Sequence, residues 1–179
     1  METVYSYTHA MSIFLRSVTD SDLPIIFEQQ ADPESSAMAA FPSRDRQVFD
    51  AHWAKIMADE TVILRTIVFN GQVAGHLVSF LLEGKREVGY WLGREFWDRG
   101  IATEALRQFL GVVMTRPLYA HVAKHNIGSR RVLEKCGFTV TGEDRFLNRV
   151  NEEVEEFVLR LDIMKGRSPW AGSVNSLVE

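Results

Sequence analysis

The sequence predicts a mixed α+β domain, with a twisted, mostly antiparallel sheet of about seven strands and about four flanking helices. Three observations predict this class. Two β-rich runs in the first half are separated by a hairpin dipeptide, a strand–helix–strand unit occupies the middle, and a second hairpin closes the chain. We expect a single domain over residues 11–162, with loosely ordered ends over residues 1–10 and 165–179.

Composition limits the class of protein before any motif is considered. Of the 179 residues, 46% are hydrophobic and 25% are charged, as in an ordinary globular chain. A net charge of −4 at pH 7 removes the attraction on which general nucleic-acid binding depends. The single cysteine, Cys136, cannot form an intrachain disulfide, and neither a signal peptide nor a membrane-spanning run is recognisable. We therefore expect a cytoplasmic protein with no nucleic-acid and no membrane partner.

The first elements are a short strand and two helices. Ser12–Val18 is predicted to be a strand, and Thr19–Asp22 offers several N-cap residues for a helix that begins near Leu23. Within Arg46–Asp59, apolar residues recur at steps of three and four, which places them on one helical face. They are Phe49, Trp53, Ile56 and Met57. We expect this second helix to pack rather than to catalyse.

Three consecutive strands follow the helices. They are predicted over Thr61–Phe69, Val73–Leu82 and Glu87–Leu92. Between the first two lies Asn70-Gly71, the dipeptide best suited to a type I′ hairpin turn. The segment Glu83–Arg86 is turn-like, and Gly93 ends the third strand. The sheet is therefore expected to be antiparallel up to this point.

The period of the apolar residues changes after the third strand. From Ile101 to about Thr115 the pattern is helical, and Pro117 then precedes a strand over Leu118–Val122. The expected buried face of the helix consists of Ile101, Ala105, Phe109 and Val112. Because strand, helix and strand follow one another, residues 87–122 are a βαβ candidate with parallel strands. Such a unit places a helix N-terminus beside the end of a strand.

The last elements are a short helix and a hairpin. The helix is predicted over Asn126–Cys136 and is ended by Gly137, which suits the left-handed position after a helix. Phe138–Arg145 and Val154–Leu161 are expected to form the closing hairpin.

The segment Trp97–Ala105 passes from a strand end through Gly100 into a helix. The first N–H groups of a helix have no internal partner, and the helix dipole adds partial positive charge there. Gly100 would let an anion approach the backbone closely. This turn is therefore a candidate pyrophosphate site, although a glycine-containing strand-to-helix turn alone is often purely structural.

Three spaced motifs together resemble the GNAT superfamily of N-acetyltransferases, and most closely its ribosomal-protein N-terminal (RimJ/RimL-like) branch. The motifs are V-G-Y-W-L at Val88–Leu92, F-W-D-R-G-I-A-T-E-A at Phe96–Ala105 and N-I-G-S-R-R-V-L-E-K-C-G-F at Asn126–Phe138. The resemblance implies a sheet that is splayed at strands 4 and 5, with acetyl-CoA as acetyl donor in the splay. It implies binding roles for Trp91, Leu92, Trp97, Asp98, Arg99, Gly100, Ile101, Ala102, Thr103, Asn126 and Ser129.

The chain departs from the family pattern at three positions. Trp97 stands where the pattern has a basic or amide residue, and Asp98 stands where relatives often have glycine. Many relatives have a tyrosine, able to protonate the departing thiolate, at the position of Leu133. Ser129 is the nearest replacement and is our candidate proton donor, with a structural role in the first helical turn as the alternative.

Glu87 is the candidate general base, acting on the acceptor amine through water, and a surface glutamate is the alternative reading. Cys136 is expected to be a small core residue rather than an acyl carrier, so attack is expected to be direct. His121 and His125 do not share a helical face, and no metal is expected. The acidic residues within Glu152–Glu156 are expected to form a solvated face or to attract a cationic acceptor.

The acceptor is expected to be a protein N-terminus or a small-molecule amine, bound by the segment Ala31–Met57 and the last hairpin. A homodimer is a further expectation from the resemblance. Two other readings stay open at this stage: an acyl-CoA sensor that has lost its chemistry, and a nucleotide-binding α/β protein. The second is disfavoured because the chain contains no G-x-x-x-x-G-K-[ST] motif.

Overall fold

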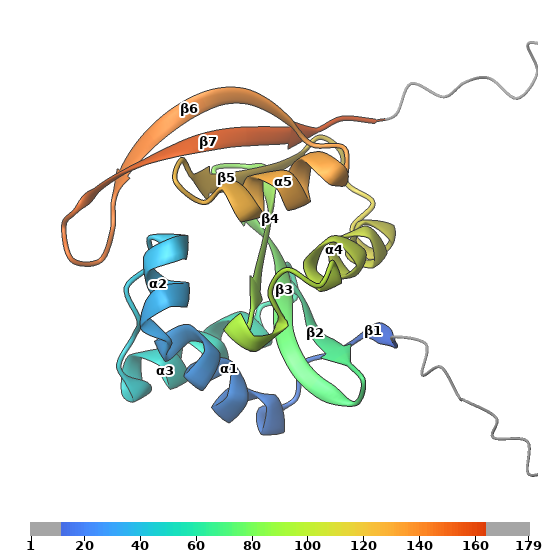
Figure 1. Cartoon of the computed structure of the whole chain (residues 1–179), viewed down its shortest axis with the longest axis vertical. Coiled ribbons are helices and arrows are strands. Elements are labelled where there is room, and N and C mark those ends of the chain that lie inside the picture. Colours follow the sequence, from blue (N-terminus) through green and yellow to red (C-terminus); the bar gives the residue numbers. More distant parts are fainter. Residues whose placement is uncertain (1–11, 164–179) are drawn as a thin grey trace, which may run out of the picture.

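The computed structural model describes residues 12–163, which form one seven-stranded sheet with helices around it (Figure 1). The strands are β1 (Ile13–Arg16), β2 (Ile63–Phe69), β3 (Gln72–Leu82), β4 (Lys85–Leu92), β5 (Leu118–Ala123), β6 (Thr139–Leu147) and β7 (Glu153–Leu161). Their order in the sheet is β1-β2-β3-β4-β5-β7-β6, and only β4 and β5 are parallel neighbours. The predicted mixed, mostly antiparallel sheet and its βαβ unit are confirmed. The predicted ends, residues 1–10 and 165–179, lie outside the described residues.

The helices are α1 (Leu23–Ala31), α2 (Pro33–Ala39), α3 (Arg46–Ala58), α4 (Ile101–Val112) and α5 (Ile127–Lys135), with single 3₁₀ turns η1 (Asp20–Asp22) and η2 (Arg94–Phe96). The helix α2 was not predicted from the sequence. Its seven residues begin with Pro33, and the Asp32 carboxylate caps it by accepting from the Ser35 N–H at 2.8 Å. These start signals lay in a stretch too short and too polar to show a helical apolar period.

Two turns lie where the sequence predicts them, and the second one shifts the start of the next strand. Asn70 and Gly71 both have positive φ, 48° and 81°, as the predicted type I′ turn requires. The next turn is centred on Glu83 and Gly84, so β4 begins two residues before the predicted Glu87.

The predicted buried face of the helix α4 was wrong at one position. Val112 is 42% exposed, whereas Val113 is 1% exposed. Val113 takes the buried place because it lies four residues after the fully buried Phe109, and its N–H bonds to the Phe109 carbonyl at 2.9 Å. The helix ends there rather than near Thr115.

The sheet opens beside β4. Strands β4 and β5 pair only at Arg86–Leu118 and Glu87–Tyr119, whereas β5 pairs with β7 along its whole length. On its other side, β4 is held close to β3, because a Cβ on Gly75 would lie 2.0 Å from the Trp91 carbonyl oxygen. The end of β4 therefore stays fixed to β3 while its β5 side is free. Figure 1 shows α4 and α5 on one side of this opening, and α1–α3 below the β6–β7 hairpin.

Apolar packing forms two core clusters on opposite faces of the sheet. The larger one joins α4 and α5 to the strands and includes Ile67, Leu77 and Phe109. The smaller one joins α1 and α3 to Leu64 and includes Trp53. The alternation of side chains along β2 explains this division, because Leu64 and Ile67 point to opposite faces. No helix within residues 12–163 is long and apolar enough to cross a membrane.

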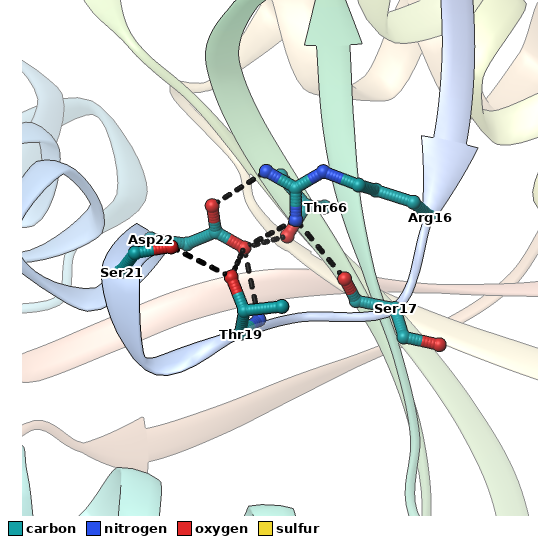
Figure 2. Close-up of polar contacts among 6 residues, drawn as sticks. All are labelled: Arg16, Ser17, Thr19, Ser21, Asp22 and Thr66. Atoms are coloured by element: carbon teal, nitrogen blue, oxygen red, sulfur yellow. Dashed lines mark hydrogen bonds and ion pairs between the residues drawn. The ribbon is translucent and has the colours of Figure 1, made fainter.

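A partly buried ion pair between Arg16 and Asp22 fixes the first strand to the 3₁₀ turn (Figure 2). The Asp22 carboxylate accepts two hydrogen bonds from Arg16, both at 2.6 Å, one from the Thr66 hydroxyl at 2.8 Å and one from the Thr19 N–H at 2.9 Å. Burial alone would raise the pKa of Asp22, but the hydrogen bonds from Arg16, Thr19 and Thr66 outweigh burial and lower it to about 2. This carboxylate is thus fully partnered and structural.

Candidate active site

Two clefts meet at the end of β4, where the sheet opens. The first has a volume of about 480 Å³ and lies against the N-termini of α4 and α5. The second has a volume of about 590 Å³ and lies among β4, β5, the β6–β7 hairpin and the segment after α2. Both are lined by Ala39, Tyr90, Trp91, Asn126 and Ser129. Two molecules bound in the two clefts would therefore meet at these shared residues.

The first cleft contains an uncapped helix N-terminus. Gly100 is the N-cap residue of α4 with φ 74°, and no described side chain caps this end. By contrast, α2, α3 and α5 are capped by Asp32, Asp45 and Asn126. Gly100 and the first three residues of α4 line the cleft, so their N–H groups are available to an anion. A Cβ at Gly100 would meet nothing within 4 Å, so the glycine is required by its φ rather than by packing.

Two cationic side chains, Arg131 and Lys135 of α5, line the same cleft. The sequence analysis did not select them, although both lie in the third motif and recur at helical spacing. Asp98 also lines this cleft and has φ 56°, the left-handed region that favours glycine. The departure from glycine at this position therefore adds both a negative charge and backbone strain.

All the residues predicted to bind a cofactor line the first cleft except Arg99. The Arg99 guanidinium instead lies 4.5 Å from the centroid of the Phe69 ring. Trp97 is half-buried, and its indole N–H donates to the Leu92 carbonyl at 2.9 Å. This bond ties the loop before α4 to the end of β4. Trp97 therefore has a structural role at the position where the family pattern has a basic or amide residue.

A tyrosine that the sequence analysis did not select stands between the two clefts. The Tyr90 hydroxyl donates to the Ser129 Oγ at 3.0 Å, and the Asn126 side chain accepts from the Ser129 N–H at 3.0 Å. Burial raises the pKa of Tyr90 to about 12. The family tyrosine position, Leu133, is in the core and only 3% exposed. The phenol thus comes from β4 rather than from α5.

Glu87 is 3% exposed and lines the second cleft, so it is not a surface glutamate. One of its oxygens lies 3.7 Å from Nε2 of His121, whose Nδ1 lies 2.6 Å from a Glu156 oxygen. These contacts with Glu156 and Glu87 raise the pKa of His121 to about 10, so the ring is cationic at neutral pH. Asp144 is near: one ligand atom from each of His121, Asp144 and Glu156 lies within 4.8 Å of the others.

The acidic residues within Glu152–Glu156 do not all lie on the same face of the hairpin. Glu156 is 9% exposed and lines the second cleft, whereas Glu153 and Glu155 pair with Arg145 on the surface. The expected solvated face is therefore correct for Glu153 and Glu155 and wrong for Glu156. His125, the second histidine of the sequence analysis, lies 3.0 Å from the Ala37 carbonyl and is separate from this group.

Cys136 is half-buried against the core, and its Sγ lies 3.5 Å from the Thr103 carbonyl oxygen. Burial raises the pKa of this thiol. It is absent from the lining of both clefts. A thiol that is both buried and protonated is a poor nucleophile.

The second cleft has walls from both segments that were expected to shape an acceptor pocket. One wall is the segment after α2, and the other is the β6–β7 hairpin. The Phe41 and Phe146 rings stack across them with centroids 5.7 Å apart, and Arg149 donates to the Pro42 carbonyl at 3.1 Å. These contacts tie the two walls together.

Comparisons with known proteins agree with this geometry. Residues 12–139 match the family model described as an acetyltransferase (GNAT) domain. Over 107 residues the chain is 29% identical to the "Putative ribosomal N-acetyltransferase YdaF" of Bacillus subtilis (strain 168). This match covers 56% of the chain and only 58% of that protein.

Two solved structures show the same fold. A GNAT-family acetyltransferase from Bacillus anthracis superposes with a TM-score of 0.72 at 18% identity, over 84% of this chain and 94% of that one. The ribosomal-protein-alanine N-acetyltransferase from Brucella melitensis superposes with a TM-score of 0.70 at 17% identity, over 84% and 99% of the two chains.

Proposed function

The chain belongs to the GNAT family of acetyltransferases, and we propose that it transfers the acetyl group of acetyl-CoA to a primary amine by direct attack. The observation that carries this proposal is the meeting of the two clefts at Tyr90, Trp91, Asn126 and Ser129. A donor in one cleft and an amine in the other reach each other only there. The likeness to YdaF favours the ribosomal-protein branch, and hence a protein α-amine, over a small-molecule amine.

The residues of the first cleft fit the donor. The free N–H groups after Gly100 suit a pyrophosphate, and Arg131 and Lys135 add positive charge beside them. Trp91 and Leu92 line this cleft at the end of β4, where β5 no longer pairs with the strand, and so they flank the path of an extended arm toward the meeting point. When bound, acetyl-CoA supplies an activated acetyl group. The chain supplies the orientation that brings this group to the second cleft.

In this proposal Glu87 takes the proton of the acceptor amine. It lines the second cleft, is hidden from bulk solvent, and leaves most of its hydrogen-bonding capacity unused within the described residues. An α-amine with a pKa near 8 is about one tenth neutral at pH 7, whereas a lysine amine near 10.4 needs about 4.6 kcal/mol to lose its proton. Glu87 therefore has a modest task with an α-amine, which it performs through a water molecule.

Tyr90 and Ser129 act together on the departing thiolate. Because Tyr90 donates to the Ser129 oxygen, the Ser129 hydrogen is free to point at the sulfur. A phenol whose pKa is raised to about 12 holds its proton more strongly than a thiol near 8.5 does. The pair therefore stabilises the thiolate by hydrogen bonding, and the proton that finally reaches the sulfur comes from the amine by way of Glu87.

Release of free thiol from acetyl-CoA in the presence of an amine panel tests the proposal. The panel should contain peptides with free N-termini, amino acids, polyamines and aminoglycosides. We expect amine-dependent turnover that falls about 10²-fold in Ser129→Ala and about 10-fold in Tyr90→Phe. Ser17→Ala, on the exposed link after β1, is the matched control. Tight donor binding without turnover of any amine would instead identify the sensor that the sequence analysis left open.

A further inference from the structure

The second cleft carries two arginines that have no carboxylate partner within residues 12–163. Arg44 lies on the segment after α2, and Arg149 follows β6; both line the cleft. Within the described residues, Arg149 donates a hydrogen bond to the Pro42 carbonyl, and its guanidinium lies 5.8 Å from the centroid of the Phe41 ring. Arg145 on the same hairpin, in contrast, pairs with Glu153 and Glu155 outside the cleft.

These arginines lie close enough to repel each other. Burial lowers the pKa of Arg44, and the charge of Arg149 lowers it further. Burial together with Arg44, Arg149 and Lys55 lowers the pKa of His52 to about 4, so this imidazole is neutral. Arg44 is half-buried and Arg149 is exposed, and the two neighbouring guanidinium charges favour the approach of an anion to this end of the cleft.

A buried imidazole beside this group lacks a hydrogen-bond partner. His76 of β3 is 6% exposed, lines the second cleft, and has an Nδ1 without a partner in the described chain. Its ring packs edge-on against Trp53 at 5.0 Å, and burial lowers its pKa to about 3. The ring is thus neutral and held rigidly, and its unpartnered Nδ1 is itself hidden from solvent.

The opposite end of the cleft is acidic. Glu87, Glu156 and Asp144 line it around the His121 ring. Asp144 pairs with Glu156 across the hairpin, and β6 continues for three more residues to Leu147 before Arg149 is reached. At about 3.4 Å per residue, the acidic and basic ends are roughly 10 Å or more apart along the hairpin.

From this division of charge we infer that the acceptor is a primary amine that also carries a carboxylate or phosphate, with the anion held by Arg44 and Arg149 and the amine directed to Glu87. The inference rests on the proposed function, because it names the acceptor class of the same site. An amino acid and a peptide with an acidic side chain near its N-terminus share this chemistry.

Calorimetric titration of the CoA-saturated protein tests the inference without requiring turnover. One arm uses ω-amino acids of two to eight carbons and their matching amides. The second arm uses tetrapeptide amides with glutamate or glutamine at the second position. We expect at least one acid to bind about 10-fold more tightly than its neutral partner, and the arm in which this occurs identifies the source of the anion.

The double variant Arg44→Gln/Arg149→Gln should reduce the ratio of acid to neutral affinity to below about twofold. The control Arg46→Gln/Arg145→Gln removes two paired arginines outside the cleft and should keep the ratio. Equal binding of every acid and its neutral partner, no binding of any probe, or a ratio that survives the double variant would overturn the inference.

Thiol release measured on the same samples separates the two proposals. Acetyl transfer with no preference for acids would overturn the inference and leave the proposed function standing. Acid-selective binding that depends on Arg44 and Arg149, with no transfer to any probe, would support the anion subsite and contradict the proposed function.

Discussion

Two buried carboxylates, Asp22 and Glu87, are almost equally inaccessible and differ in how they are partnered. Asp22 is 2% exposed and accepts hydrogen bonds from Arg16, Thr19 and Thr66 (Figure 2). Glu87 is 3% exposed, and its one close polar contact within the described chain is His121 at 3.7 Å. Asp22 lines neither cleft, whereas Glu87 lines the second. Burial alone therefore does not identify a functional carboxylate.

The difference lies in what each group can still do. Both oxygens of Asp22 accept hydrogen bonds, and its pKa is lowered to about 2, so it does not accept a proton at neutral pH. Glu87 keeps acceptor capacity toward the cleft, and the cationic His121 lies between it and Glu156. A complete set of partners stabilises the fold, while an incomplete set beside a cleft serves chemistry.

The largest expected effect is that of Glu87→Gln. We expect kcat near pH 7 to fall by 10²- to 10⁴-fold, or about 3–5 kcal/mol, because both the protonated amine and the nitrogen of the tetrahedral adduct lose their base. The loss should shrink at alkaline pH, where the amine is already neutral. The measurement is kcat against pH for wild type and variant. A loss of the same size at every pH would show that Glu87 is not the base.

The reciprocal change is Asp22→Asn, which should act on stability instead. Removing the charge weakens the hydrogen bonds that Asp22 accepts from Arg16, Thr19 and Thr66, and we expect a loss of about 2 kcal/mol and a fall in Tm of about 4–8 °C. At 25 °C, kcat per folded molecule should stay within about twofold of wild type. Denaturant unfolding and steady-state rates measure both quantities. A variant that keeps its Tm but loses activity would show that Asp22 serves the reaction rather than the stability of the fold.

The free energy of unfolding should depend on pH through Asp22. Folding lowers the pKa of Asp22 from 3.8 to about 2. As the pH falls, Asp22 is therefore protonated in the unfolded chain before it is protonated in the folded chain, and this difference lowers stability. The resulting contribution, about 2 kcal/mol, is complete above pH 4 and is lost as pH falls through about 2. The stability difference between wild type and Asp22→Asn should therefore narrow between pH 4 and 2. A difference that stays constant over this range would contradict the assigned pKa.

The smallest effect is expected at a third carboxylate, Asp98, which is exposed at the edge of the first cleft. Asp98→Gly removes a negative charge near the proposed pyrophosphate site and also the left-handed strain at φ 56°. We expect acetyl-CoA to bind about three- to tenfold more tightly. Asp98→Asn removes only the charge, so comparing the Kd values of the two variants separates the causes. Unchanged affinity in both would indicate that Asp98 points to solvent.

Much of the fold could be predicted because its signals are local. The Asn70-Gly71 turn, the helical period that starts at Ile101 and the stop at Gly137 each depend on a few adjacent residues. The uncapped helix N-terminus in the first cleft could also be predicted, since it belongs to one continuous strand-to-helix turn. The helix α2 was missed because its capping signals were not accompanied by an apolar period.

The second cleft could not be predicted in the same way, because it is assembled from distant segments. Tyr90 and Ser129 are 39 residues apart, and Glu87 and Glu156 are brought together only through His121 on β5. Arg44 and Arg149 lie near each other only because the β6–β7 hairpin reaches the segment after α2, as Figure 1 shows. No spacing within the sequence encodes such contacts.

Calorimetric titration with acetyl-CoA tests most directly whether the first cleft is the donor site. Three proteins should be compared: wild type, Gly100→Glu and Gly71→Glu. Both glycines have positive φ, 74° and 81°, with open space at Cβ, so the two variants carry the same charge and similar strain. We predict saturable 1:1 binding by wild type and Gly71→Glu, and loss of binding in Gly100→Glu. Equal binding by all three proteins, or none by folded wild type, would contradict the account.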